Sequence, residues 1–170
     1  QDLLRISVAD AGNDHRLGGN EAPPAILSMF IGTDLEKVLK CVEEDLPYNE
    51  ETLKSLEIDV NVLPSFKKDT TDRNRTSPFA FTGNKFEFRM LGSTANIACP
   101  NTILNTIVAE SLDYISDYIE GKDDLDKALN EVLKKILKEH KAIIFNGNNY
   151  APEWVEEAES RGLLNLKSSA

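Results

Sequence analysis

The sequence predicts an α+β fold in which antiparallel strands, including a β-hairpin near residues 79–90, are packed by helices. Apolar residues alternate with polar ones around Gly83-Asn84, a pattern typical of two strands joined by a tight turn. Elsewhere apolar residues recur every three or four positions, which is the period of an amphipathic helix. No internal repeat or composition shift separates these patterns, so we expect one domain over residues 1–170.

The N-terminal part of the chain predicts short elements separated by a polar loop. Residues 2–11 predict the end of a helix, which the following Gly-Asn pair closes. Residues 14–24 contain glycines, prolines and four ionisable groups without apolar periodicity, which indicates a loop. The continuous apolar run over 25–31 predicts a buried strand, although its periodicity leaves a buried helix open.

A capping box predicts the next helix, over about 34–44. The Thr33 hydroxyl and the Glu36 carboxylate can each satisfy an orphan amide of the first turn, and apolar residues follow at helical spacing. Residues 45–72 are mixed and polar, which predicts an excursion between two core elements.

Three helices are predicted in the C-terminal part. Residues 101–119 place their apolar side chains on one face, and a second helix opens at Asp123 and Asp124 and carries a similar stripe. We expect these two helices to pack together. A last helix begins with Pro152 in its first turn and ends at Gly162.

The composition favours a soluble globular protein. The chain has 170 residues, 41% of them hydrophobic and 28% charged, with a formal net charge of −10. That charge argues against nucleic acid or an anionic membrane as a partner, and no apolar run is long enough to span a bilayer. The two cysteines form no Cys/His cluster, so we expect a reducing, cytoplasmic setting. The chain begins with Gln1 rather than Met, and we expect a piece of a longer protein whose upstream part is absent.

Positive charge is concentrated between residues 65 and 90, a segment that contains six basic and three acidic residues. In the second strand of the hairpin, Lys85, Glu87 and Arg89 alternate with apolar residues and therefore share one face. This face is either a surface ladder of ion pairs or part of a cleft that holds anions and a metal ion. The loop over 14–24 is likewise either a polar turn or a mobile binding flap.

Three separated blocks resemble the C-terminal half of the catalytic domain of type III glutamine synthetases. The blocks are His15–Pro24, Asp72–Arg89 and Pro100–Thr102, and they occur in the family's order. The resemblance implies ATP-dependent ligation of ammonia to glutamate through γ-glutamyl phosphate, which forms glutamine in nitrogen assimilation. It further implies Mg²⁺ or Mn²⁺ as cofactor and a homo-oligomer of stacked rings.

The resemblance also assigns roles to residues of the first two blocks. Arg16 would hold a carboxylate of glutamate, and Glu21, on the flap, would receive the proton of ammonium. Arg75 would contact the nucleotide phosphates and the transferring phosphoryl group. Such clamping of charge is what phosphoryl transfer requires.

On the hairpin, the resemblance places Lys85 near ATP, Glu87 on the metal shared with ATP, and Arg89 on glutamate. The family's other metal ligands lie upstream of this chain, and one carboxylate cannot hold two ions. We therefore expect the 170-residue piece to be inactive alone. Two alternatives for the longer protein remain open: a non-catalytic, glutamine synthetase-like assembly protein, and a related ligase that joins glutamate to another amine.

Overall fold

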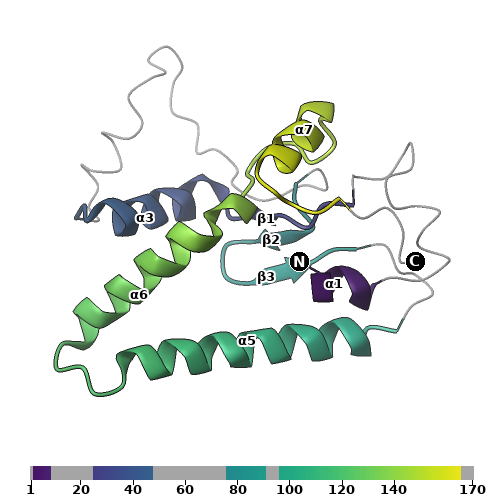
Figure 1. Cartoon of the computed structure of the whole chain (residues 1–170). Helices are drawn as coiled ribbons and strands as arrows, with labels where there is room; N and C mark the ends of the chain where they lie inside the picture. Colours follow the sequence, from purple (N-terminus) through teal and green to yellow (C-terminus); the bar gives the residue numbers. More distant parts are fainter. Residues whose placement is uncertain (1, 9–24, 48–75, 91–95, 166–170) are drawn as a thin grey trace, which may run out of the picture.

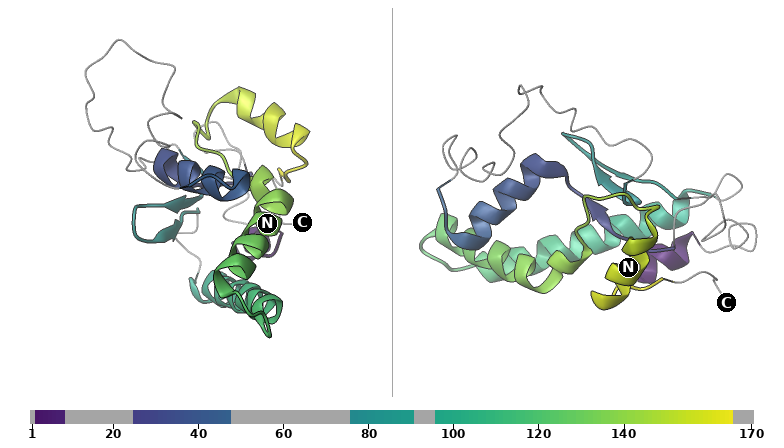
Figure 2. Two further views of the ribbon diagram at one scale, coloured as in Figure 1. Left: turned by 90° about the vertical axis from the view of Figure 1, so that its left-hand side faces the viewer. Right: turned by 90° about the horizontal axis from the view of Figure 1, so that it is seen from above.

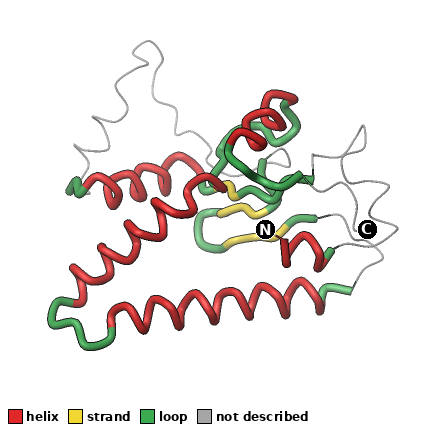
Figure 3. The backbone as a smooth tube through the Cα atoms, in the orientation of Figure 1, coloured by secondary structure: helices red, strands yellow, loops and turns green. Residues whose placement is uncertain are grey.

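The computed structural model describes residues 2–8, 25–47, 76–90 and 96–165, and it has the mixed α+β character that the sequence predicts. Figure 1 labels the elements along the chain, and Figure 3 separates helices from strands. Their bounds are α1 (Asp2–Ser7), β1 (Met29–Phe30), α3 (Gly32–Glu44), β2 (Phe79–Phe81), β3 (Phe86–Phe88), α5 (Ala98–Ile119), α6 (Leu125–His140), the 3-10 turn η1 (Lys141–Ile143) and α7 (Pro152–Ser160).

The described strands form one small sheet in the order β1-β2-β3. β2 and β3 are antiparallel, with Ala80 opposite Glu87, which confirms the predicted hairpin. The apolar run over 25–31 is buried and contains β1, so the strand interpretation is correct for its last part. β1 pairs in parallel with β2, however, and not in the antiparallel sense that we expected. A parallel neighbour needs a crossover connection, and the chain between β1 and β2, which includes α3, provides it.

Helix α3 confirms the helix predicted over 34–44, but its predicted capping box is wrong. The helix begins at Gly32, before Thr33, and its N-cap residue, Ile31, makes no side-chain cap. The cap comes instead from Asn146, whose Oδ1 accepts hydrogen bonds from the amides of Ile31 and Gly32, each at 3.0 Å. Asn146 Nδ2 then donates to Glu36 Oε2 at 2.9 Å. The Asn146 side chain therefore caps the start of α3 in place of the predicted pair, Thr33 and Glu36.

The segment just before Asn146 extends the sheet beyond β1. The Phe145 amide donates to the Met29 carbonyl at 2.8 Å, and Ile144 forms a parallel bridge with the same residue. On the β2 side, the Ser77 hydroxyl donates to the Phe145 carbonyl at 3.1 Å. The C-terminal region is therefore joined to β1 and to the start of β2 by backbone and side-chain hydrogen bonds.

The core cluster lies under α7, whose predicted start at Pro152 is confirmed. Trp154 is buried together with Ile26 and Ala158, and its ring stacks on that of Phe145 with centroids 3.7 Å apart. A Cβ at Gly147 would come within 2.6 Å of the Phe145 ring. Because this ring is held by the stack, Gly147 is the residue that lets the loop pass so close.

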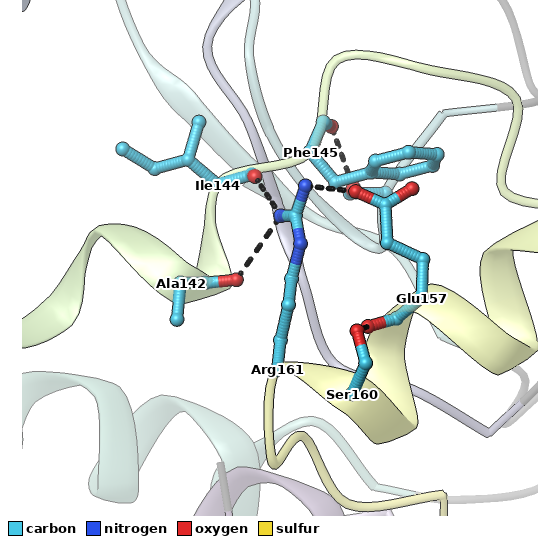
Figure 4. A network of polar contacts seen from close by, with 7 residues as sticks. Ala142, Ile144, Phe145, Glu157, Ser160 and Arg161 are labelled. Carbon is cyan, nitrogen blue, oxygen red and sulfur yellow. Dashed lines mark hydrogen bonds and ion pairs between the residues drawn. The ribbon is translucent and has the colours of Figure 1, made fainter.

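Arg161 fastens the end of α7 to the chain after α6, as Figure 4 shows. Its Nη1 donates to the carbonyls of Ala142 and Ile144, at 3.2 and 2.8 Å, and its Nη2 pairs with Glu157. The guanidinium also lies 5.3 Å from the centre of the Trp154 ring. This network holds the residues that precede Asn146 in place.

Helices α5 and α6 pack together as predicted, joined by a turn in which Gly121 has φ +72°. Asp124 is the N-cap of α6, and its side chain accepts a hydrogen bond from the Lys127 amide at 3.0 Å. Helix α5 lies along one edge of the described structure (Figure 1, Figure 2). Although its sequence is strongly apolar, no residue of α5 is buried.

We predict that Asn146→Ala lowers the free energy of unfolding by about 1–3 kcal/mol, because two amides of α3 lose their acceptor and Glu36 loses a donor. Chemical denaturation of the 170-residue chain measures this. Glu36→Ala is the matched control, since it removes only the exposed acceptor of Asn146 Nδ2 and leaves Asn146 Oδ1 on the two amides, so it should cost less than Asn146→Ala. Equal stability of Asn146→Ala and wild type would contradict the role given to Asn146.

Candidate functional site

The charged face of the hairpin brings together three predicted site residues. Arg89 donates to Glu87 Oε2 through Nε and Nη2, at 3.1 and 2.8 Å. Lys85 Nζ lies 3.2 Å from the other carboxylate oxygen, Oε1. The predicted arrangement, a carboxylate between two cations on one sheet face, is therefore confirmed.

The other face of the hairpin is aromatic. Phe79 and Phe86 stack with ring centroids 5.2 Å apart, and Phe81 lies 5.1 Å from Phe86 in a tilted contact. The turn is closed by a hydrogen bond from the Thr82 amide to the Lys85 carbonyl at 2.9 Å, with Gly83 at φ +96°. The aromatic contacts and the tight turn together fix the register that places Lys85, Glu87 and Arg89 on one side.

Buried hydroxyl groups anchor the base of the hairpin. Ser28 and Ser77 are both almost fully buried, and the Ser28 hydroxyl donates to the Ser77 hydroxyl at 2.7 Å. Next to Ser77, the Pro78 carbonyl accepts a hydrogen bond from the Arg89 amide at 2.6 Å. Sequence reasoning missed these two serines, because nothing local in the sequence distinguishes a buried serine pair from serines in a loop.

The ion pairs of the hairpin are accessible to solvent. The side chain of Lys85 is 65% exposed, and those of Glu87 and Arg89 are about one third exposed. Such exposed ion pairs contribute little to the stability of the fold, which is what the interpretation as a surface ladder expects. The same exposure leaves two cations and one carboxylate at a surface where an anion can approach, so the cleft interpretation stays open.

The described residues alone do not fit a divalent metal ion. Among them, no group of three or more His, Cys, Asp or Glu side chains could hold one. Glu87 is a single carboxylate, and a cation accompanies each of its oxygens. Mg²⁺ requires six ligands, so Glu87 could supply only a small part of its shell.

The other predicted site residues, Arg16, Glu21 and Arg75, lie outside the described residues. A separate cleft of about 600 Å³ lies between α3 and the C-terminal end of α6, with Leu39 and Leu137 among its lining residues. The predicted site residues that the structure describes, Lys85, Glu87 and Arg89, do not line that cleft. In the described ranges, the geometry therefore concentrates the predicted chemistry on the hairpin.

Comparisons with known proteins show which sequences this chain is similar to. The family model described as "Glutamine synthetase C-terminal domain" matches residues 128–170, which include most of α6 and all of α7. The "Type-3 glutamine synthetase" of Dictyostelium discoideum is 47% identical over 99% of this chain. The chain is homologous to a segment of glutamine synthetases. This finding confirms the resemblance that the three sequence blocks indicated.

Two bacterial relatives agree with this relationship. The "Glutamine synthetase" of Butyrivibrio fibrisolvens is 49% identical and that of Bacteroides fragilis 43% identical, each over 98% of this chain. The chain spans about a quarter of the length of these glutamine synthetases, 23–24% in the three relatives. Within the described ranges, no helix is both long enough and apolar enough to cross a membrane.

We predict that Glu87→Gln changes the free energy of unfolding by less than about 1 kcal/mol, because the pairs it removes are exposed. The change should shrink further at high ionic strength, where exposed charges are screened. Denaturation of both proteins at low and high salt measures it, with Glu131→Gln on α6 as a matched control. A salt-independent loss of several kcal/mol would show that the hairpin charges are structural.

Proposed function

We propose that the longer protein to which this chain corresponds catalyses the ATP-dependent ligation of ammonia to glutamate, forming glutamine through γ-glutamyl phosphate. The observation that carries the proposal is the 43–49% identity to glutamine synthetases along nearly the whole chain. The charged hairpin supports it, since this chemistry needs fixed positive charge around carboxylate and phosphate groups.

In this proposal the hairpin cations bind the two anionic substrates. Arg89 holds a carboxylate of glutamate, for which the planar guanidinium offers paired donors. Lys85 lies near the phosphates of ATP as a compact point charge. In the absence of substrate, Arg89 pairs with Glu87. A substrate carboxylate then competes with Glu87 for the Arg89 guanidinium.

Residues outside the described ranges complete the proposed site. Arg16 binds glutamate, Glu21 receives the proton that ammonium releases, and Arg75 contacts the nucleotide phosphates and the transferring phosphoryl group. These assignments rest on the match to family motifs in the sequence. We further propose Mg²⁺ or Mn²⁺ as cofactor, with Glu87 as one ligand. Since the described residues do not form a metal site, we assign no step to the ion.

The proposal includes the setting of the longer protein. We propose a cytoplasmic homo-oligomer of stacked rings that uses glutamate and ammonia as substrates. The unpaired cysteines support a reducing compartment: Cys41 is buried and Cys99 is exposed, and both are free thiols. The 170-residue chain alone is inactive in this proposal, because one carboxylate cannot assemble the metal site.

We predict that phosphate release by the longer protein, with ATP and magnesium, requires both glutamate and ammonium. Arg89→Ala should lower kcat/KM by about tenfold to a hundredfold, as expected for loss of a charge-assisted hydrogen bond to substrate. Lys127→Ala on α6 is the matched control, which removes an exposed charge without affecting the hairpin. The 170-residue chain should release no phosphate under the same conditions.

Other outcomes of this assay would replace the proposal. Phosphate release with glutamate and another amine, but not with ammonium, would indicate the related ligase. A folded, ring-forming protein that releases no phosphate would indicate the non-catalytic assembly protein.

A further inference from the structure

The residue that caps α3 belongs to an Asn-Gly pair, Asn146-Gly147, and no other asparagine of the sequence is followed by glycine. Asparagine loses its side-chain amide fastest before glycine, because a residue without Cβ lets its backbone nitrogen approach the asparagine side chain unhindered. The next two asparagines, Asn148 and Asn149, precede bulkier residues. Asn146 is therefore the position at which the sequence most favours spontaneous deamidation.

This reaction consumes water and releases ammonia, without an oxidant or a reductant. The Gly147 nitrogen gives its proton to hydroxide and attacks Cγ of Asn146, and the new N–Cγ bond closes a succinimide ring. The Cγ–Nδ2 bond breaks, and the leaving amide takes a proton from water and departs as ammonia. A water molecule then opens the ring. Opening at Cγ gives aspartate, and opening at the main-chain carbonyl gives isoaspartate.

The attacking nitrogen is available in the structure. Gly147 is exposed to solvent, so hydroxide can reach its N–H group. In the part of the chain that the structure describes, the Gly147 amide makes no hydrogen bond. The surroundings of Gly147 therefore do not slow the first step.

The asparagine side chain, in contrast, is held at both ends. Its Oδ1 accepts hydrogen bonds from the amides of Ile31 and Gly32, each at 3.0 Å, and its Nδ2 donates to Glu36 Oε2 at 2.9 Å. We call these three hydrogen bonds the α3 cap. Attack by Gly147 requires the Asn146 side chain to turn back toward its own main chain, and this movement breaks the α3 cap.

The main chain before Asn146 is held as well. The Phe145 amide is hydrogen-bonded to β1, and the Phe145 ring is stacked on Trp154 in the core. Arg161 binds the carbonyl of the residue before Phe145 at 2.8 Å (Figure 4). A Cβ at position 147 would lie 2.6 Å from the Phe145 ring, so the fold also requires the glycine of the pair. The fold thus retains the labile pair and restrains it.

We propose that Asn146 is a deamidation site that the α3 cap protects. It reacts when the start of α3 detaches, and isoaspartate at this position then prevents the α3 cap from re-forming. Isoaspartate lengthens the main chain by one carbon atom and carries its carboxylate directly on Cα, which withdraws the acceptor from the amides of α3. It also replaces the donor to Glu36 by a negatively charged group, which the Glu36 carboxylate repels.

The chemical step thereby makes a transient opening permanent. This inference rests on the contacts of the described residues and not on the proposed reaction.

Peptide mapping by mass spectrometry tests the proposal on the 170-residue chain, aged at mildly alkaline pH in buffer and in denaturing urea. In urea, Asn146 should convert before Asn148 and Asn149. In buffer, conversion of Asn146 should be more than about tenfold slower than in urea, because it requires local opening. Equal rates in the two conditions would overturn the proposal. Faster conversion in buffer would overturn it too, since the two amides at Oδ1 would then stabilise the oxyanion of the attack.

Variants of α3 separate the α3 cap from the rest of the helix. Glu36→Ala removes the acceptor of Nδ2 and should raise the conversion rate in buffer several-fold, whereas Glu36→Gln keeps an acceptor and should stay close to wild type. Glu44→Ala, which removes an exposed carboxylate from the other end of α3, is the matched control and should leave the rate unchanged. In urea all these proteins should react at one rate. Equal rates of Glu36→Ala and Glu44→Ala in buffer would contradict the protection by the α3 cap.

Hydrogen exchange tests the consequence for α3. After ageing in urea and return to buffer, molecules with isoaspartate at position 146 should exchange the amide hydrogens of Ile31 and Gly32 more than about tenfold faster than unmodified molecules of the same sample. The amides of α6, to which the Asn146 side chain makes no hydrogen bond, are the internal reference. Equal protection of Ile31 and Gly32 in the two forms would show that the α3 cap re-forms, and the proposal would be wrong.

Discussion

The rest of the described fold depends on the hydrogen bonds of the Asn146 side chain. Its oxygen accepts hydrogen bonds from the first amides of α3, and its nitrogen donates to Glu36. The residue before it, Phe145, is hydrogen-bonded to β1 and stacked on Trp154 in the core. Two adjacent residues therefore join a helix start, a strand and the core cluster. Because Ser77 also donates to the Phe145 carbonyl, the base of the charged hairpin is held by the same junction.

The sequence predicted those elements whose signals are local. The hairpin could be predicted because its turn and its alternation of apolar and polar residues lie within twelve residues. Helix α7 could be predicted because Pro152 marks its start. The cap of α3 could not be predicted from local sequence, since Asn146 lies more than a hundred residues from Gly32. The local capping box offered a competing solution, which the structure does not use. The parallel pairing of β1 was missed for the same reason, since a pattern of apolar residues carries no information on strand direction.

The candidate site could be predicted only in part from physics. Alternation alone placed Lys85, Glu87 and Arg89 on one face, and the ion pairs confirm that placement. Charge patterning could not decide between a ladder and a substrate site, because both need exposed, alternating charges. Homology to glutamine synthetases favours the substrate site. The single carboxylate of the hairpin agrees with this homology, since a metal site there would need further ligands from a longer polypeptide.

The most direct test of this account is an experimental structure of the longer protein with glutamate and a non-hydrolysable ATP analogue bound. The account predicts that both ligands lie against the charged face of the hairpin, with Arg89 on a glutamate carboxylate instead of on Glu87. Ligands bound away from the hairpin, with the Arg89–Glu87 pair intact, would contradict it.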